Sequence, residues 1–470
     1  MLTRRLTSSR FAPLVVLLAG TFMVVLDFFI VNVAVPSIQD RLHAGQGATE
    51  WILAGYGIAL AAFLIAAGRL GDAYGRRRLF VLGLGLFTLA SGACGVAPDP
   101  TALVAARIVQ GAGAALLTSS VLSIIGVLYD GADRIRALGI YGLVLGLAAV
   151  SGQLIGGLLI GLDVAGLGWR SCFLINLPVG GLALALAPIL VPESRTAERD
   201  RLDPVATLLL SSGLVALVLP LIEGRQHGWP LWTSCSFAAV PALFGLLVAQ
   251  QRRRLTCGRS VLVAPALLRE RAFAAGLGVQ IVFWAGQASY FLVLALYLQA
   301  GRHLGPLAAG LTFTIVAVTY MAASVRAPEL TLRYGRRLVG VGALTLAAGH
   351  AALLAAVGLV GTGGSIWALA PGLLLAGAGM GFCITPLTAI SLGPLTPESA
   401  GAASGALATV QQVGNAVGVA VTGVIFFGAL GGGWGHAFEL SLVELAVLLL
   451  AVAGLARLLP GPSRPEAALA

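Results

Sequence analysis

Fourteen long apolar segments follow one another along this chain of 470 residues, and only short connections separate them. A helix needs about 20 mostly apolar residues to cross a bilayer. The segments meet this length within a few residues, so the sequence predicts an all-α polytopic membrane protein in a lipid bilayer. The predicted spans are 12–35, 50–68, 79–97, 102–128, 137–161, 171–191, 205–222, 231–249, 272–299, 307–325, 339–360, 366–390, 401–429 and 438–459.

Charged residues are too few for a soluble protein. They make up 10% of the chain, against about 25% in ordinary soluble domains. This shortage argues against a soluble enzyme, a disordered scaffold and a nucleic-acid-binding module. The five cysteines are isolated in the sequence, without a CxxC motif or a Cys/His cluster, so we expect no metal site and no disulfide framework.

The 29 Lys and Arg residues are all arginines, and their positions predict the orientation of the chain. Basic residues favour the cytoplasmic side of a membrane. If the N-terminus is cytoplasmic, 24 arginines fall on that side, four fall outside and Arg107 lies within a span. We therefore expect a multi-pass protein of a bacterial plasma (inner) membrane with both termini in the cytoplasm. The net charge of +10 is then a topology signal and does not indicate a nucleic-acid partner.

The same three residues follow the second and the tenth predicted spans. Gly75-Arg76-Arg77 and Gly335-Arg336-Arg337 lie eight spans apart, whereas a plain six-helix repeat would place them six spans apart. Two extra helices between two six-helix bundles explain the difference, and internal repeats are typical of secondary transporters. This interpretation gives an N-terminal bundle over 1–200, two linker helices over 201–255 and a C-terminal bundle over 256–470. The alternative is that Gly-Arg-Arg is only a common cytoplasmic turn.

Five motifs at matching positions resemble the major facilitator superfamily, specifically its fourteen-helix drug:proton antiporter branch. They are Leu26–Pro36 in the first span, the loop 68–78, Arg107–Ala115 in the fourth span, Trp169–Gly180 around the start of the sixth, and Ser399–Gly405 at the start of the thirteenth. The resemblance covers nearly the whole chain. It implies a proton-coupled antiporter that exports amphiphilic organic compounds, such as drugs, dyes or antibiotics, by alternating access. We expect a monomer that is not an enzyme and that needs no cofactor besides the proton gradient.

Two positions depart from the pattern of that branch. Its span-5 motif normally reads Gly-Pro-x-x-Gly-Gly, and here Gln153 replaces the proline between Gly152 and Gly157. The loop motif has Ala73 where a basic residue is usual, which we expect only to tune the loop. The first departure leaves the details of antiport open, and with them the alternative of a transporter for one specific metabolite.

Asp27 in the first span is the residue that we expect to carry the proton. An ionised carboxylate within a span is costly, so it usually faces a cavity or a partner. Desolvation also favours the protonated form of a carboxylate. Arg107 in the fourth span needs an acceptor, for which Asp27 and backbone carbonyls are candidates. The resemblance implies that Arg107 takes part in proton movement; the alternatives are a packing carboxylate and a structural clamp.

The loop between the second and third spans is expected to act as a conformational latch. By resemblance, the latch includes Gly68, Asp72, Gly75 and Arg76. Charges at helix ends can favour one closed state over another, and glycines permit the tight turn. The alternative, charge that only sets the topology, does not explain Asp72.

One face of the ninth predicted span combines aromatic and amide side chains. Amides are costly against lipid and should point inward, so we expect this face to line a substrate cavity; an aromatic packing stripe is the alternative. The residues assigned to the cavity are Gln280, Trp284, Gln287, Tyr290 and Phe291 from that span, Gln110 from the fourth, and Gln411 and Asn415 from the thirteenth.

Glycines four residues apart allow helices to approach closely, and the fifth span contains such pairs. We expect helix packing at Gly152, Gln153, Gly156 and Gly157, including contact with the tenth span. Asn32 lies about 140° round the helix from Asp27. We therefore expect Asn32 to bond an adjacent helix while Asp27 faces the cavity.

A polytopic membrane enzyme is the alternative from another class of function. It would need convergent catalytic groups, whereas the five histidines are isolated in the sequence. No catalytic residue is therefore assigned.

Overall fold

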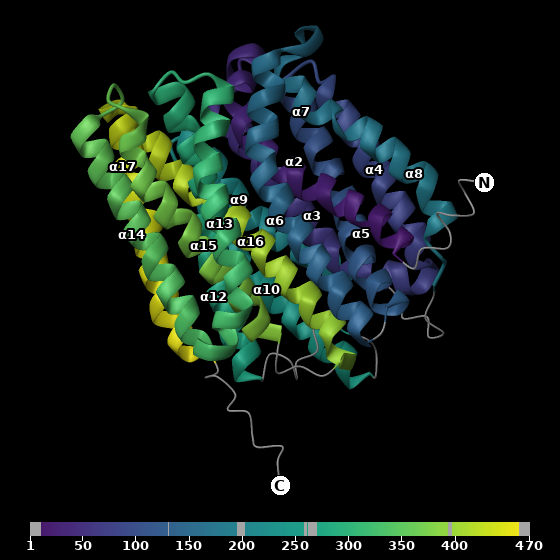
Figure 1. Ribbon diagram of the computed structural model, residues 1–470. Coiled ribbons are helices and arrows are strands. Elements are labelled where there is room, and N and C mark those ends of the chain that lie inside the picture. The colour runs from purple at the N-terminus through teal and green to yellow at the C-terminus, as the bar shows by residue number, and fades with distance from the viewer. Residues whose placement is uncertain are drawn as a thin grey trace. The chain divides into compact units, whose positions relative to one another are not determined.

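The computed structural model describes residues 11–129, 131–194, 203–257, 261, 270–392 and 397–459, with the backbone alone at some helical positions. Within these ranges the regular structure is helical (Figure 1). Thirteen of the described helices are long and apolar enough to cross a membrane, and Leu147–Leu162 adds a shorter apolar stretch. The prediction of an all-α polytopic membrane protein is confirmed.

The chain divides into two compact units. Unit 1 is Met1–Leu262 with Gly305–Gly310, and unit 2 is Val263–Leu304 with Leu311–Ala470. The helices of unit 1 are α2 (Ala12–Leu42), α3 (Gln46–Tyr74), α4 (Arg76–Gly95), α5 (Pro100–Leu128), α6 (Gly131–Leu162), α7 (Ser171–Leu174), α8 (Asn176–Leu190), α9 (Pro204–Gln226) and α10 (Leu231–Thr256).

Unit 2 holds the remaining helices, except that the first turn of α13 is counted with unit 1. They are α12 (Arg271–Leu296), α13 (Pro306–Tyr334), α14 (Arg336–Val360), α15 (Ala370–Leu392), α16 (Pro397–Ala429) and α17 (Trp434–Leu455). Short 3₁₀ or π turns occur in both units. They are η1 (Val164–Gly166) and η2 (Gly168–Arg170) in unit 1, and η3 (Tyr297–Gly301), η4 (Ile366–Leu369), η5 (Leu430–Gly432) and η6 (Ala456–Leu458) in unit 2.

Several helices run beyond the ends of the predicted spans. The first span was predicted to end at 35, but α2 continues through Pro36 to Leu42. Proline removes only one backbone donor from a helix, and membrane helices tolerate that loss. In the sixth span, α7 passes into α8 through Ile175, whose backbone angles are helical.

The glycine of each Gly-Arg-Arg turn has a positive φ, although the ψ angles of the two turns differ. Gly75 precedes α4 with φ of 113°, and Gly335 precedes α14 with φ of 53°. Both angles lie where residues with a Cβ are strained, so glycine is needed at each turn. A shared backbone requirement at both sites favours an internal repeat over a chance tripeptide.

Close helix crossings repeat as well. A Cβ on Gly113 of α5 would lie 2.6 Å from the backbone nitrogen of Phe87 in α4. A Cβ on Gly379 of α15 would lie 2.5 Å from the backbone nitrogen of Leu346 in α14. The α4–α5 and α14–α15 pairs therefore cross at matching glycines, each inside its own unit.

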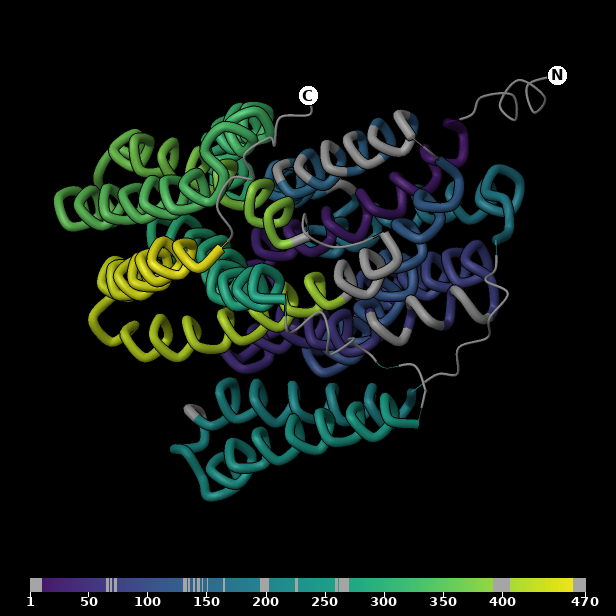
Figure 2. The backbone as a smooth tube through the Cα atoms, turned by 90° about the horizontal axis from the view of Figure 1, so that it is seen from below, coloured from purple at the N-terminus to yellow at the C-terminus, as the bar shows by residue number. Residues whose placement is uncertain are grey.

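The two extra helices, α9 and α10, pack side by side and are counted in unit 1 (Figure 2). Asp203 precedes α9 and accepts from the backbone N–H of Ala206 at 3.0 Å. From α10, Gln251 donates to Asp203 at 2.9 Å, and Arg254 Nε lies 3.1 Å from it. Burial alone would raise the pKa of Asp203, but hydrogen bonds from Gln250, Ala206 and Gln251, together with the charge of Arg254, lower it below its usual value.

Asp203→Asn is expected to destabilise the chain more at pH 7 than at pH 3. Because the pKa of Asp203 is lower in the folded state, its stabilisation is present above the unfolded pKa of about 3.9. It is lost as the pH falls through the folded value. We expect a loss of about 1 kcal/mol at pH 7, measured by thermal unfolding with tryptophan fluorescence. Asp99→Asn, at the exposed N-cap of α5, is the control. Equal losses at both pH values for Asp203→Asn would contradict this reading.

Candidate functional site

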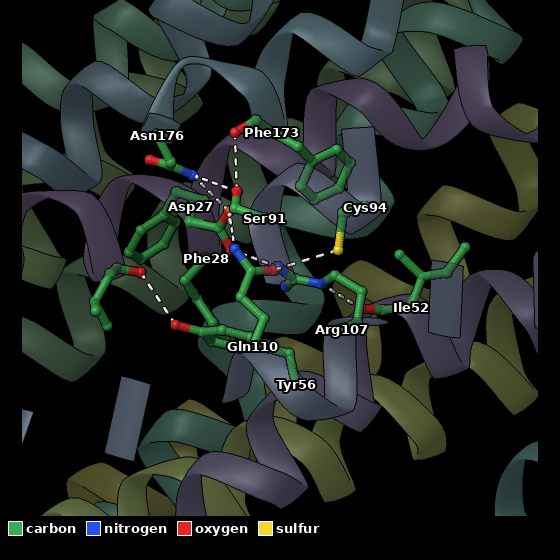
Figure 3. Close-up of polar contacts among 12 residues, drawn as sticks. Asp27, Phe28, Ile52, Tyr56, Ser91, Cys94, Arg107, Gln110, Phe173 and Asn176 are labelled. Atoms are coloured by element: carbon green, nitrogen blue, oxygen red, sulfur yellow. Dashed lines mark hydrogen bonds and ion pairs between the residues drawn. The ribbon is translucent and has the colours of Figure 1, made fainter. Parts of the chain in front are cut away.

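Asp27 and Arg107 form a buried ion pair inside unit 1 (Figure 3). Arg107 Nη1 of α5 donates to Asp27 Oδ2 of α2. The side chains are 0% and 1% exposed, respectively, for Asp27 and Arg107. The sequence named each residue as a candidate, and Asp27 as an acceptor for Arg107. The structure brings the two together, so Asp27 contacts a partner helix here.

Two amides complete the hydrogen bonding of the Asp27 carboxylate. Gln110 Nε2 donates to Asp27 Oδ1 at 2.8 Å, and Asn176 Nδ2 of α8 donates to the same oxygen at 3.1 Å. Asn176 Nδ2 also lies 3.0 Å from Ser91 Oγ of α4, whose hydroxyl donates to the Phe173 carbonyl at 2.8 Å. Three donors, one of them charged, offset the cost of burying this carboxylate. The network joins α2, α4, α5 and α8 around one acid.

Arg107 has acceptors besides Asp27. Its Nε donates to the Ile52 carbonyl of α3 at 3.1 Å, and its Nη1 donates to Gln110 Oε1 at 2.7 Å. The guanidinium carbon lies 4.2 Å from the ring centroid of Tyr56, a distance at which a cation and an aromatic ring attract. If Asp27 took up a proton and released Arg107, the arginine would keep two oxygen acceptors and an aromatic ring.

Sequence reasoning missed several members of this network. Asn176 was present in the Trp169–Gly180 motif but was not singled out, and Ser91 and Tyr56 carried no signal beyond being polar within spans. Glu50 is fully buried at the start of α3. The argument that selected Asp27, that an acid within a predicted span is costly, applies equally to Glu50 and would have found it.

We expected Asn32 to bond an adjacent helix, but its hydrogen bonds to described residues lie within its own helix. Its Nδ2 donates to the Phe29 carbonyl of its own helix at 3.2 Å. Short polar side chains can be satisfied by carbonyls one turn earlier, and that local partner replaces the interhelical one. The predicted separation from Asp27 holds, since the two side chains have different partners.

The glycines of α6 allow close approach to α2. A Cβ on Gly152 would lie 2.9 Å from Phe29 Cβ, and one on Gly156 would lie 2.7 Å from Ile30 Cγ1. Gly157 meets the Pro306 carbonyl in the first turn of α13, the part of that helix that belongs to unit 1. Close packing is thus observed at these three glycines.

Gln153 occupies the motif position where proline is usual. Its side chain is buried, and neither its amide nitrogen nor its oxygen has a hydrogen-bond partner among the described residues. An amide buried in this way costs free energy that the usual proline would not. The departure from the motif is therefore a physical change as well as a change in sequence.

Two residues of the predicted latch, Gly68 and Asp72, are described by their backbone alone. At the described part, the backbone N–H of Arg76 donates to the Ser194 carbonyl at 3.0 Å. Glu193, which follows α8, lies 3.7 Å from Arg77 and 3.8 Å from Arg78. A Cβ on Gly75 would lie 2.7 Å from Glu193 Oε1, so glycine is needed here for space as well as for φ. Glu193 is thus a partner of this loop that the sequence did not reveal.

Part of the expected substrate-facing set comes together in unit 2. Gln280 Oε1 of α12 accepts from Trp284 Nε1 at 2.7 Å and from Gln411 Nε2 of α16 at 3.3 Å. Asn415 Nδ2 donates to Gln412 Oε1 at 3.2 Å. Gln110, which we grouped with these residues, is instead a ligand of Asp27 in unit 1. The reason is its place three residues after Arg107, on the same helical face.

The other members of the α12 face lie further along that helix. Gln287, Tyr290 and Phe291 are buried. The Phe291 ring stacks on Phe313 of α13, with ring centroids 5.8 Å apart. Gln287 Oε1 and the Tyr290 hydroxyl have no hydrogen-bond partner among the described residues. This stretch combines aromatic packing with buried polar atoms that lack a hydrogen-bond partner among the described residues.

Long apolar helices, matching turns and crossings in two units, and a charged pair buried within a span define a class of protein, the helical secondary transporters. A family model described as the Major Facilitator Superfamily matches residues 17–419. The chain belongs to this superfamily.

Known relatives are bacterial transport and resistance proteins. The chain is 40% identical to the "Probable actinorhodin transporter" of Streptomyces coelicolor, over 90% of this chain and 73% of the relative. It is 35% identical to the puromycin resistance protein pur8 of Streptomyces alboniger, over 89% of this chain and 82% of the relative. A crystal structure of a POT family transporter superposes with a TM-score of 0.67 at 18% identity, covering 93% of this chain and 95% of the other, and supports the fold alone.

Arg107→Met is expected to destabilise the chain by about 3–5 kcal/mol, because it leaves the Asp27 carboxylate buried without its cation. Adding Asp27→Asn to this variant should restore most of the loss. SDS-driven unfolding of the purified full chain measures both effects.

Arg77→Met, which removes a partly exposed partner of Glu193, serves as the control and should cost less than about 1 kcal/mol. Losses that simply add in the double variant would show that Asp27 and Arg107 are not energetically coupled.

Proposed function

We propose that the chain exports amphiphilic organic compounds, such as drugs, dyes or antibiotics, in exchange for protons. The observation that carries this proposal is the buried Asp27–Arg107 pair with its amide ligands. Relatives named as an actinorhodin transporter and a puromycin resistance protein support an antibiotic-like substrate. The transporter works as a monomer in the bacterial plasma (inner) membrane, with both termini in the cytoplasm, and is driven by the proton gradient without a cofactor.

Asp27 is the proton-binding group of this proposal, and Arg107 is its counter-ion. When Asp27 is ionised, the charged donor and the two amides hold α2, α5 and α8 together. A proton on Asp27 cancels the attraction and leaves Arg107 to Gln110 and the Ile52 carbonyl. The two protonation states then favour different helix arrangements, which is the requirement for coupling.

The proton gradient is a sufficient energy source for uphill export. One pH unit is worth about 1.4 kcal/mol per proton, and each charge that moves through 100 mV adds about 2.3 kcal/mol. A gradient of this size supports accumulation ratios of tens to hundreds, since about 1.4 kcal/mol corresponds to a factor of ten.

The segment 68–78 biases one state in this scheme. It was predicted as a loop but consists of the end of α3, Gly75 and the start of α4. Gly68, Asp72, Gly75 and Arg76 form the latch with the end of α8, where Glu193 faces Arg77 and Arg78. Breaking contacts around Glu193 would free the cytoplasmic ends of α4 and α8 to move. This role rests on the family resemblance of the loop together with the described contacts.

The substrate is contacted by the α12 face and its partners on α16. Gln280, Trp284 and Gln411 offer amide and indole groups, and Gln287, Tyr290 and Phe291 continue the face. A transporter of one specific metabolite is the second candidate, because Gln153 departs from the antiporter motif. A broad range of exported compounds would favour the first candidate and a single one the second.

Asp27→Asn is expected to abolish drug-driven proton movement in proteoliposomes while leaving downhill exchange of the drug. The amide keeps the size of the carboxylate but cannot carry the proton. A pH-sensitive dye inside the vesicles measures the proton, and a labelled drug measures exchange. Asp99→Asn, at the exposed N-cap of α5, should couple normally. Undiminished coupled transport by Asp27→Asn would refute the assignment.

Gln287→Ala is expected to shift the substrate range and to leave proton coupling intact. Relative transport rates for a panel of drugs should change by severalfold, since one neutral hydrogen bond contributes about 0.5–1.5 kcal/mol. Thr345→Ala on exposed α14 surface provides the matched control. A variant that transports every compound as the unaltered chain does would favour a packing role for this face.

A further inference from the structure

Tyr290 and His350 stack on each other inside unit 2. Their ring centroids lie 4.8 Å apart with 35° between the planes. Tyr290 comes from α12 and His350 from α14, and the side chains are 1% and 2% exposed. His350 stands alone in the sequence, and nothing in the proton-coupling scheme uses it.

The polar atoms of this pair have no hydrogen-bond partner among the described residues. They are the Tyr290 hydroxyl and both ring nitrogens of His350, and Gln287 Oε1 is in the same condition. Gln287 lies three residues before Tyr290, so both occupy one helical face. Buried polar groups are almost always paired, because an unpaired one loses its hydration without compensation. Several such atoms on two facing helices indicate a place that hydrogen-bonds a ligand.

The internal repeat gives His350 a counterpart in unit 1. Gly83 of α4 and Gly342 of α14 lie at matching close crossings with α5 and α15. Eight residues beyond these glycines, the positions matched by the crossings hold Ser91 and His350. Their offset of 259 residues is one fewer than the offset of 260 between the Gly-Arg-Arg turns. Ser91 is fully engaged in the Asp27 network, with Phe173 and Asn176 as partners. His350 holds the same place in unit 2 without such partners.

The charged pair of unit 1 has no equivalent at the matching positions of unit 2. Counted from the matching glycines of α5 and α15, the positions of Arg107 and Gln110 correspond to Leu373 and Ala376. Both are fully buried. The polar place around His350 is therefore neutral, whereas its counterpart around Ser91 is built on an ion pair.

Two acidic side chains of α17, Glu444 and Glu439, have neighbours other than Tyr290 and His350. Glu444 Oε2 accepts from Thr422 Oγ1 of α16 at 2.9 Å. Glu439 lies beside Gly358, near the end of α14. Among the described residues, no acidic side chain hydrogen-bonds to Tyr290 or His350. A ligand with a fixed positive charge would therefore have no counter-ion bonded to this pair, and desolvating an unpaired charge is costly.

An uncharged planar aromatic ligand matches the chemistry of this place. Imidazole and phenol each offer a donor and an acceptor, and the amide oxygen of Gln287 accepts. Aromatic surface continues from Tyr290 to Phe291, with ring centroids 5.7 Å apart, and on to Phe313. A planar ligand that inserts among these buried rings would stack on them while hydroxyl and carbonyl groups at its edge meet the polar atoms.

We propose that Tyr290, His350 and Gln287 form a binding site in unit 2 for an uncharged planar aromatic compound that bears hydroxyl and carbonyl groups. This inference rests on the proposed export function and names its substrate class. The ligand satisfies the polar atoms that the bundle leaves unused.

Binding to the purified full chain in detergent tests the proposal at pH 6.5. The probe is 1,8-dihydroxyanthraquinone, and the cationic comparator is tetraphenylphosphonium; equilibrium dialysis gives both Kd values. Tyr290→Phe and His350→Phe keep an aromatic ring but remove the polar atoms. Each should weaken anthraquinone binding about 5- to 10-fold. Neither should lower the unfolding temperature, because each deletes an unpaired buried group.

Tyr297→Phe, at the start of η3 directly after the same helix, is the matched control. Its hydroxyl already donates to the Gly361 carbonyl at 2.9 Å, so its loss should lower the unfolding temperature and spare binding. Wild-type anthraquinone affinity in both test variants would overturn the site. So would tighter binding of tetraphenylphosphonium than of the anthraquinone, or reduced stability in both variants, which indicates a packing role. Binding in detergent involves no proton gradient, so its result does not depend on proton coupling. A failure of coupling through Asp27 would be seen only in the proteoliposome experiment.

Discussion

The burial of one carboxylate within a membrane span is the constraint on which the interior of unit 1 depends. Asp27 cannot be hydrated there, so other helices supply what water would have supplied. Arg107 and Gln110 come from α5, and Asn176 comes from α8. The packing glycines of α6 then allow α2 to lie close to its neighbours. The helices of this unit are thus held by a polar centre as well as by apolar contact, which drives association only weakly in lipid.

The two units share helix crossings but differ in their polar chemistry. Matching glycines set the α4–α5 and α14–α15 contacts. Around them, unit 1 carries charge and unit 2 carries neutral amides, a phenol and an imidazole. Charge is suited to sensing a proton, and neutral groups with aromatic rings are suited to holding an organic molecule. In the proposed mechanism, similar helix crossings would thus hold a proton-binding centre in unit 1 and a substrate-binding face in unit 2.

Much of the fold could be predicted from the sequence, because a helix that crosses lipid must be long and apolar, and runs of apolar residues of that length are easy to recognise. Asp27 and Arg107 could also be predicted, since charge within a span is rare enough to stand out. Partners were harder to predict. Asn176 and Ser91 are ordinary polar residues in spans, and only the three-dimensional arrangement shows that they meet Asp27. Asn32 could satisfy itself within its own helix, an outcome that helical spacing alone does not reveal.

The ring of Tyr56 beside Arg107 has a consequence for energy conservation. The ring centroid lies 4.2 Å from the guanidinium carbon, and the Phe173 ring lies 5.7 Å from it. These aromatic faces place apolar carbon beside the charged centre. A membrane that stores a proton gradient is discharged by any continuous file of water molecules through a protein. In the proposed proton-coupled cycle, apolar rings beside Arg107 would oppose such a file, so that export would not drain the gradient that powers it.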